Sequence, residues 1–154
     1  GTHQAASAAP GDWFVTPGGS GDCSQSSPCS LDTTLGAAAG GDTIYIAAGT
    51  YTGSGGAVIT VPQSITLYGG WDGTSATPPV LDPDAYPTAI DSEDVRRGVY
   101  VGEGIAVTLD GFTVTNGWVM GNGGGLYARN ANLTLREMSF YSNTITNTHW
   151  CSLP

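Results

Sequence analysis

The sequence predicts an all-β fold, a β-solenoid of a few stacked coils with a short capping helix near its N-terminus. Three observations predict it. Strand-length segments are separated by turn residues, two sets of these strands repeat at a nearly constant spacing, and a single helical segment precedes them. The 24 glycines and the charged fraction of 11% indicate a chain rich in tight turns, because ordinary globular chains contain roughly a quarter charged residues.

The length of 154 residues is typical of one domain. We expect a flexible N-terminal arm at 1–12, a single β-solenoid domain at 13–147 and a C-terminal tail at 148–154. We divide the domain into a capping region, 13–41, and coils, 42–147.

The capping region combines a short strand and a helix. The segment DWFVTPGG is typical of a strand closed by turn residues, and SLDTTLGAAAGGD predicts a helix. Ser30 is the expected N-cap, and Gly40 with Gly41 is the expected end. A helix this short needs a surface to cover, so we expect it to lie over the first coil.

The segments that follow have the length and alternation of strands: TIYIAAGTY, AVITV, ITLYGGW, GVYVG, IAVTLDGFTVTNG, GGLYARN and ANLTLREMSFYSN. The run VTLDGFTVTNG from Val107 aligns with LTLREMSFYSN from Leu133, 26 positions later. The preceding GVYV and GLYA, from Gly98 and Gly125, are 27 positions apart. This agreement predicts that each strand stacks on the strand one repeat earlier.

The charge of the chain excludes some partners. The chain contains thirteen acidic residues, four arginines and no lysine, which gives a net charge of −9. We expect no nucleic-acid partner, because phosphate binding depends on clustered Lys and Arg. We also expect no membrane span, since no apolar run approaches the roughly 18 residues that one needs.

The three cysteines differ in their surroundings. Cys23 and Cys29 flank the polar spacer SQSSP, which can fold back on itself, and nothing nearby completes a metal site. We therefore predict a disulfide between them, and with it an extracellular or cell-surface location. Cys151 is then a free thiol, an intermolecular bridge or a packing residue, and with Trp150 it is a candidate intersubunit contact.

The motifs WFVTPGGSGDCSQSSPCSLDTTLGAAAGGDTIYIAAGTYT, ITLYGGWDGT, LDGFTVTNG and GGGLYARNANLTLREMSFYSN resemble the repeat proteins of the pectin-lyase-like superfamily, especially large surface proteins of bacteria. They span residues 12–147. The resemblance implies a right-handed parallel β-helix. It implies less about activity, because related solenoids include lyases, hydrolases, adhesins and passenger domains. Those proteins generally have many more coils, so we expect a fragment or a chain that completes itself by assembly.

The densest group of acids offers a candidate calcium site. Carboxylate-rich loops bind calcium, although the spacing here matches no EF-hand. The alternative is a solvated, proline-broken loop between coils. The candidate ligands are Asp82, Asp84, Asp91, Glu93 and Asp94.

Aromatic residues offer a candidate carbohydrate site. Trp71 and Trp118 lie next to glycine-rich turns, where an exposed ring would stack on a sugar. We expect Tyr45, Tyr100 and Tyr127, within strands, to form ladders between coils instead.

We expect no catalytic residues. Glycoside hydrolysis needs two positioned carboxylates, whereas the residue that aligns with Asp110 one repeat later is Arg136, a candidate ion-pair partner. The predicted function is an extracellular structural or adhesive module that self-associates head to tail through an open C-terminal end and the N-terminal arm. The alternative is a carbohydrate-binding or polysaccharide-degrading β-helix protein.

Overall fold

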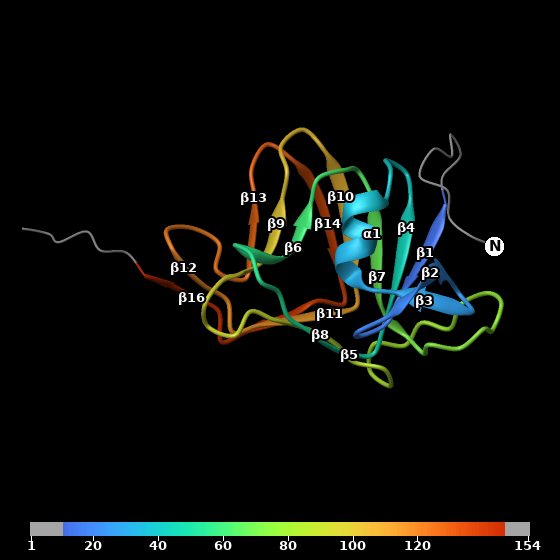
Figure 1. The fold of residues 1–154 in the computed structure, drawn as a ribbon. Helices are drawn as coiled ribbons and strands as arrows, with labels where there is room; N and C mark the ends of the chain where they lie inside the picture. Colours follow the sequence, from blue (N-terminus) through green and yellow to red (C-terminus); the bar gives the residue numbers. More distant parts are fainter. Residues whose placement is uncertain (1–10, 147–154) are drawn as a thin grey trace, which may run out of the picture.

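The computed structural model describes residues 11–146, which form sixteen short strands and one α-helix (Figure 1). This confirms the prediction of a mostly β chain with one helix. The elements are β1 (Asp12–Val15), β2 (Ser20–Ser24), β3 (Ser27–Cys29), α1 (Leu31–Ala37), β4 (Thr43–Ala47), β5 (Gly49–Tyr51), β6 (Ala57–Val61), β7 (Thr66–Trp71), β8 (Thr88–Asp91), β9 (Arg97–Val101), β10 (Ala106–Asp110), β11 (Phe112–Thr115), β12 (Trp118–Met120), β13 (Leu126–Ala128), β14 (Asn132–Arg136), β15 (Ser139–Tyr141) and β16 (Thr144–Thr146).

The strands form four sheets. Sheet A has the order β14-β10-β7-β4-β1-β3-β2, sheet B has β15-β11-β8-β5, sheet C has β13-β9-β6, and sheet D pairs β12 with β16. Within these sheets every strand pair is parallel except β2 with β3. Parallel neighbours so close in sequence require the chain to travel around the molecule between them.

The chain visits the sheets in a fixed order. Strands β4, β5 and β6 belong to sheets A, B and C in turn, and β7, β8 and β9 repeat that order. After β10 and β11 the chain forms β12 of sheet D before it returns to sheet C with β13. In Figure 1, sheets A, B and C lie on three sides of the molecule.

The strand register confirms the repeat predicted from the sequence. Val107 pairs with Leu133, 26 positions later, and Val114 pairs with Phe140 at the same spacing. In sheet C, Val99 pairs with Leu126, 27 positions later. The earlier repeat is less regular, because the pairing of β4 with β7 shifts register after Tyr45.

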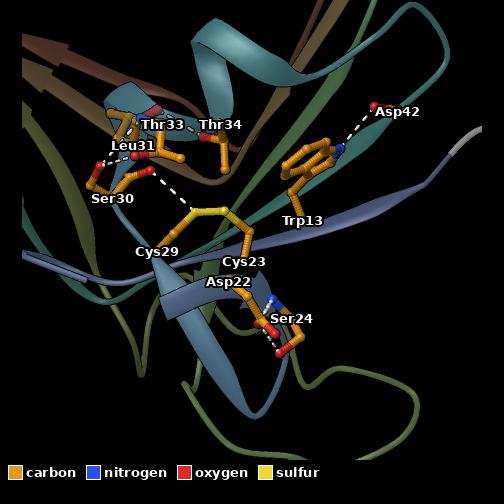
Figure 2. Close-up of a disulfide and its surroundings, with 10 residues drawn as sticks. All are labelled: Trp13, Asp22, Cys23, Ser24, Cys29, Ser30, Leu31, Thr33, Thr34 and Asp42. Atoms are coloured by element: carbon orange, nitrogen blue, oxygen red, sulfur yellow. Dashed lines mark hydrogen bonds between the residues drawn. A yellow bond between two sulfur atoms is a disulfide. The ribbon is translucent and has the colours of Figure 1, made fainter. Parts of the chain in front are cut away.

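A disulfide joins Cys23 and Cys29, as the sequence predicts, with their Cα atoms 4.5 Å apart (Figure 2). The segment around it is not a plain loop, however. It is the antiparallel hairpin β2–β3, which adds two strands to one edge of sheet A. Its composition of Ser, Gly and Asp is unusual for strands, so the sequence did not indicate it.

Helix α1 begins where predicted and ends earlier. The Ser30 Oγ accepts a 3.2 Å hydrogen bond from the amide of Thr33, as an N-cap does (Figure 2). The helix ends at Ala37 rather than at the glycines, because Ala38 is already extended while its amide still bonds to the Thr34 carbonyl. Leu31 and Ala38 are buried in the core, and the helix packs on β1 and β6.

One continuous apolar cluster fills the interior. It unites side chains from the three main sheets, such as Ile44 of sheet A, Ile90 of sheet B and Val99 of sheet C. A second, small cluster of Phe14, Ala47 and Trp71 lies apart from it. The burial of inward-facing side chains from every sheet is the main source of stability in such a stack.

Left-handed backbone marks the turns of the last two repeats. Residues with a φ angle between 46° and 84° occur in pairs 26 positions apart. The pairs are Gly104 with Asn130, Gly111 with Glu137, and Asn116 with Ser142. The repeat therefore preserves turn geometry even where the residue types differ.

Candidate functional site

The acidic residues predicted to bind calcium are not brought together. Among residues 11–146, no three His, Cys, Asp or Glu side chains form a group suited to a metal ion. Asp82 instead accepts hydrogen bonds from the amides of Asp84 and Ala85. Asp91 accepts from the amide of Glu93 and the side chain of Asn116. The Asp82 and Asp91 carboxylates stabilise turns, and the structure does not gather the predicted calcium ligands into one group.

The two candidate ion pairs among these strands and turns differ from each other. Glu93 forms a 2.6 Å ion pair with Arg96, three residues later in the same turn. Asp110 and Arg136 are paired in the register of β10 and β14, but the described residues contain no ion pair between them. The expected ion pair is therefore absent from this structure, which leaves the Asp110 carboxylate available.

Trp71 is not a surface platform for sugar. Its side chain is fully buried, and the ring packs edge-on against Phe14 at 5.1 Å between centroids. The register shift between β4 and β7 pairs Trp71 with Ala47, on the face of sheet A that points away from the main core. There the indole packs with Phe14, and Leu81 of the loop between β7 and β8 forms a bridge with Trp71. This part of the carbohydrate prediction is wrong, whereas Trp118 on β12 is half-buried. The predicted intersubunit contacts Trp150 and Cys151 lie outside the described residues.

A row of stacked aromatic rings runs along sheet A. Phe14 stacks on Tyr45 with centroids 5.0 Å apart, and Tyr45 stacks on Tyr68 at 5.7 Å. Both tyrosines are half-buried, so they form part of the outer surface. Burial raises the pKa of the Tyr45 phenol, and the nearby Asp12 carboxylate raises it further. The phenol is therefore neutral at physiological pH.

A second aromatic ladder lies on sheet C, as predicted. Tyr100 and Tyr127 stack at 5.7 Å, and the Arg97 guanidinium lies 4.9 Å from the centre of the Tyr127 ring. Arg97 also donates hydrogen bonds of 2.9 Å to the carbonyls of Asn122 and Gly123 in the next repeat. Both hydrogen bonds of this guanidinium to residues in the described part of the chain thus hold a glycine-rich loop, which indicates a structural role.

A hollow lies at the end of the tyrosine row. Its volume is about 200 Å³. The residues that line it come from β7, β10, the loop between β7 and β8, and the turn after β14: Tyr68, Gly69, Leu81, Pro83, Asp110 and Glu137. An apolar ring, an apolar loop and two carboxylates therefore meet in one small space, a combination suited to binding an amphipathic ligand.

The sequence reasoning missed both Tyr68 and Glu137. Tyr68 pairs with Tyr45 in the register, and the matching runs TIY and TLY, 23 positions apart, were a signal that could have found it. Glu137 aligns with Gly111, 26 positions earlier. A charged residue at a turn position that the previous repeat fills with glycine could have drawn attention to Glu137. The contribution of Leu81 and Pro83 depends on how the loop folds back, which no local pattern indicates.

A third feature is the edge formed by the last strands of sheets A, B and D. Strands β14, β15 and β16 each have one neighbour only, so one edge of each is unpaired within the described chain. Their side chains are more exposed than those one repeat earlier. Leu109 is 1% exposed, whereas Leu135, its partner, is 42% exposed. Phe140 is likewise 42% exposed, while its partner Val114 is fully buried.

Comparisons with protein-family models, with curated proteins and with solved structures found no match. In the described part of the chain, no helix is long and apolar enough to cross a membrane.

Proposed function

We propose that the chain is a right-handed parallel β-helix, with each repeat contributing one strand to sheets A, B and C. The fixed order of the sheets, the 26-residue register and the single apolar core support this proposal. Right-handed connections between parallel strands of one sheet are the rule, which supports the handedness.

We further propose that the protein is an extracellular structural or adhesive module that associates with a second copy of itself. The disulfide supports the location, because such bonds persist in oxidising compartments. The carrying observation is the edge formed by β14, β15 and β16. There the apolar ladder continues into Leu135, Phe140 and Ile145, which are 42–55% exposed.

The two ends of the stack differ, and this difference bears on how copies would meet. At the N-terminal end, the hairpin β2–β3 extends sheet A, and α1 packs on β6 of sheet C. At the other end the strand edges carry exposed apolar side chains. Two copies joined through the same edge would bury these side chains on both sides in a closed, two-fold contact. This geometry is favoured over the head-to-tail filament expected from the sequence.

Sedimentation velocity of the purified chain over a wide concentration range tests the proposal. We expect a dimer for the wild-type chain and a monomer for the double variant Leu135→Asp, Phe140→Asp. A matched control is Val95→Asp, because Val95 is 61% exposed in a turn away from this edge. A folded wild-type chain that is monomeric at every concentration contradicts self-association, and open-ended filaments contradict the two-fold geometry.

A further inference from the structure

Two asparagines of the chain precede a glycine, Asn116 and Asn122, and the structure holds them differently. An asparagine before glycine is especially prone to deamidation, because glycine has no Cβ to hinder attack of its backbone nitrogen on the asparagine side chain. The reaction is intramolecular, so its rate depends on whether these two groups are free to meet. The surroundings of each asparagine therefore decide whether it reacts in the folded chain.

Asn116 is held on both sides of the bond that would form. Its side-chain nitrogen donates a 3.0 Å hydrogen bond to the Asp91 carboxylate, and the buried Gly117 donates its amide to Oδ1 of Asn143 at 2.8 Å. Attack of the Gly117 nitrogen would break both hydrogen bonds and would create negative charge close to the Asp91 carboxylate. The folded structure therefore protects Asn116.

Asn122 lies in the loop between β12 and β13 and is exposed (Figure 1). Its side chain makes no hydrogen bond with any described residue, and the amide of Gly123 donates to no acceptor in the described part of the chain. The flanking positions, 121 and 123–125, are all glycine and carry no side chain that would hinder rotation of Asn122. Both reacting groups are thus free of the hydrogen bonds that hold Asn116.

The guanidinium of Arg97 favours the reactive form of this peptide. It donates a 2.9 Å hydrogen bond to the carbonyl oxygen of Asn122, which belongs to the same peptide group as the Gly123 nitrogen. That nitrogen attacks after it has lost its proton, and the peptide then shares its negative charge with the carbonyl oxygen. A cation bonded to this oxygen stabilises the charge, as donors do in an oxyanion hole. At Asn116, the carbonyl oxygen accepts instead from an uncharged backbone amide.

We propose that Asn122 is a site of spontaneous deamidation in the folded protein, whereas Asn116 is protected. The Gly123 nitrogen forms a bond to Cγ of Asn122, the bond from Cγ to the side-chain nitrogen breaks, and ammonia leaves with a proton from water. Water then hydrolyses the cyclic imide at either carbonyl and leaves aspartate or isoaspartate.

The product changes the loop that Arg97 holds. Either acid adds one negative charge close to the guanidinium, and isoaspartate also adds one methylene to the loop backbone between β12 and β13. The reaction consumes only water and needs residues of one chain, so it does not depend on the proposed association.

Peptide mapping by mass spectrometry, after incubation of the folded chain at mildly alkaline pH, tests the proposal. Chymotryptic cleavage after Phe112, Trp118 and Tyr127 separates the two sites, because Asn116 lies in 113–118 and Asn122 in 119–127. We expect conversion of amide to acid to be at least about tenfold faster in 119–127 than in 113–118. For the chain unfolded in urea, the two rates should agree within about threefold, since neither asparagine is then held.

Two further measurements identify the residue and the route. Asn122→Gln is the matched control, because glutamine would have to close a larger ring, and its 119–127 peptide should keep its mass over the same time. The imide route yields isoaspartate together with aspartate, which separate as two chromatographic peaks of equal mass.

Three results overturn the proposal. The first is conversion of Asn116 as fast as that of Asn122 in the folded chain. The second is conversion of Asn122 more than about tenfold slower in the folded than in the unfolded chain, which would mean that the loop prevents the attack. The third is a product that contains aspartate alone, which would indicate direct hydrolysis of the side chain.

Discussion

The indole Nε1 of Trp13 donates a 2.8 Å hydrogen bond to Oδ2 of Asp42, and both side chains are at least 95% buried (Figure 2). The same carboxylate accepts from the amides of Ala39 and Gly11, at 2.8 Å and 2.7 Å. One buried carboxylate therefore connects β1, the segment after α1 and the start of β4. It fixes the capping region on the first strands of sheet A.

We predict that Asp42→Ala destabilises the fold by about 3 kcal/mol, because it leaves several buried donors without an acceptor. Chemical denaturation at pH 7 measures the change in the free energy of unfolding. The exposed Asp84, whose carboxylate accepts no hydrogen bond from any described residue, provides the control. Asp84→Ala should alter the free energy of unfolding by less than about 0.5 kcal/mol. Equal effects of the two substitutions would contradict the structural role of Asp42.

Stability should decline at alkaline pH because of Tyr51. Its hydroxyl donates a 2.9 Å hydrogen bond to the Ala47 carbonyl, and burial raises the pKa of the phenol well above its ordinary value. An unfolded tyrosine ionises near pH 10, so above about pH 10 the unfolded state loses its proton first. The stabilising contribution is complete below that pH and is lost progressively as the pH rises toward the folded-state pKa.

The variant Tyr51→Phe separates this effect from general alkaline unfolding. We expect it to lose about 1 kcal/mol at pH 7, since the Ala47 carbonyl loses the shorter of its two side-chain hydrogen bonds, and to show a shallower decline above about pH 10. Denaturation curves at intervals between pH 7 and pH 12 measure both. Tyr141→Phe, at a 55% exposed side chain, should keep the wild-type profile. A wild-type slope in Tyr51→Phe would assign the alkaline loss to other groups.

Arg97 should control the mobility of the glycine-rich loop before β13. Its planar guanidinium donates to two carbonyls of that loop and lies over the Tyr127 ring, which lysine cannot reproduce. We predict that Arg97→Lys accelerates amide hydrogen exchange at Gly123–Gly125 and costs about 1–2 kcal/mol of stability. Arg129→Lys is the control, because Arg129 is exposed and 3.8 Å from Glu103. Unchanged exchange in Arg97→Lys would show that the glycines hold the loop without it.

The sequence was sufficient where the structure depends on local or periodic signals. The 26-residue repeat predicted the pairing of Val107 with Leu133, because stacked strands must align their inward-facing side chains. Ser30 predicted the start of α1, since its hydroxyl satisfies an amide that no helical residue can. The close spacing of Cys23 and Cys29 predicted their disulfide.

The features that the sequence did not predict correctly depend on contacts between residues that are distant in the sequence. Trp71 was expected to be exposed, but it is buried against Phe14 and Ala47 on the outer face of sheet A, where Leu81 of the following loop pairs with it. The hollow requires Pro83 to fold back over Gly70 and Gly111, where a Cβ at either position would lie 2.7–2.8 Å from proline atoms. No pattern within the loop itself contains this information, so the candidate site could not be predicted from the sequence.

The left-handed turns provide the last prediction. Gly111 has a φ of 84°, and an added Cβ would lie 2.8 Å from the Pro83 side chain and 3.1 Å from the Gly69 carbonyl oxygen. Gly111→Ala should therefore cost about 2 kcal/mol or more through backbone strain and overpacking. At Ser142, where φ is 54°, the reverse holds. Ser142→Gly should stabilise by about 0.5 kcal/mol, because relief of the left-handed strain exceeds the entropy that glycine adds to the unfolded chain.

Ser139→Gly is the matched control, because Ser139 lies in strand β15, where no left-handed turn favours glycine. There the same chemical change should destabilise by about 0.5–1 kcal/mol. Thermal and chemical denaturation of the three variants give the sign of each change in the free energy of unfolding. Opposite signs for Ser142→Gly and Ser139→Gly are the expected result. Destabilisation by both would mean that the turn at Ser142 gains more from its serine than it loses to backbone strain.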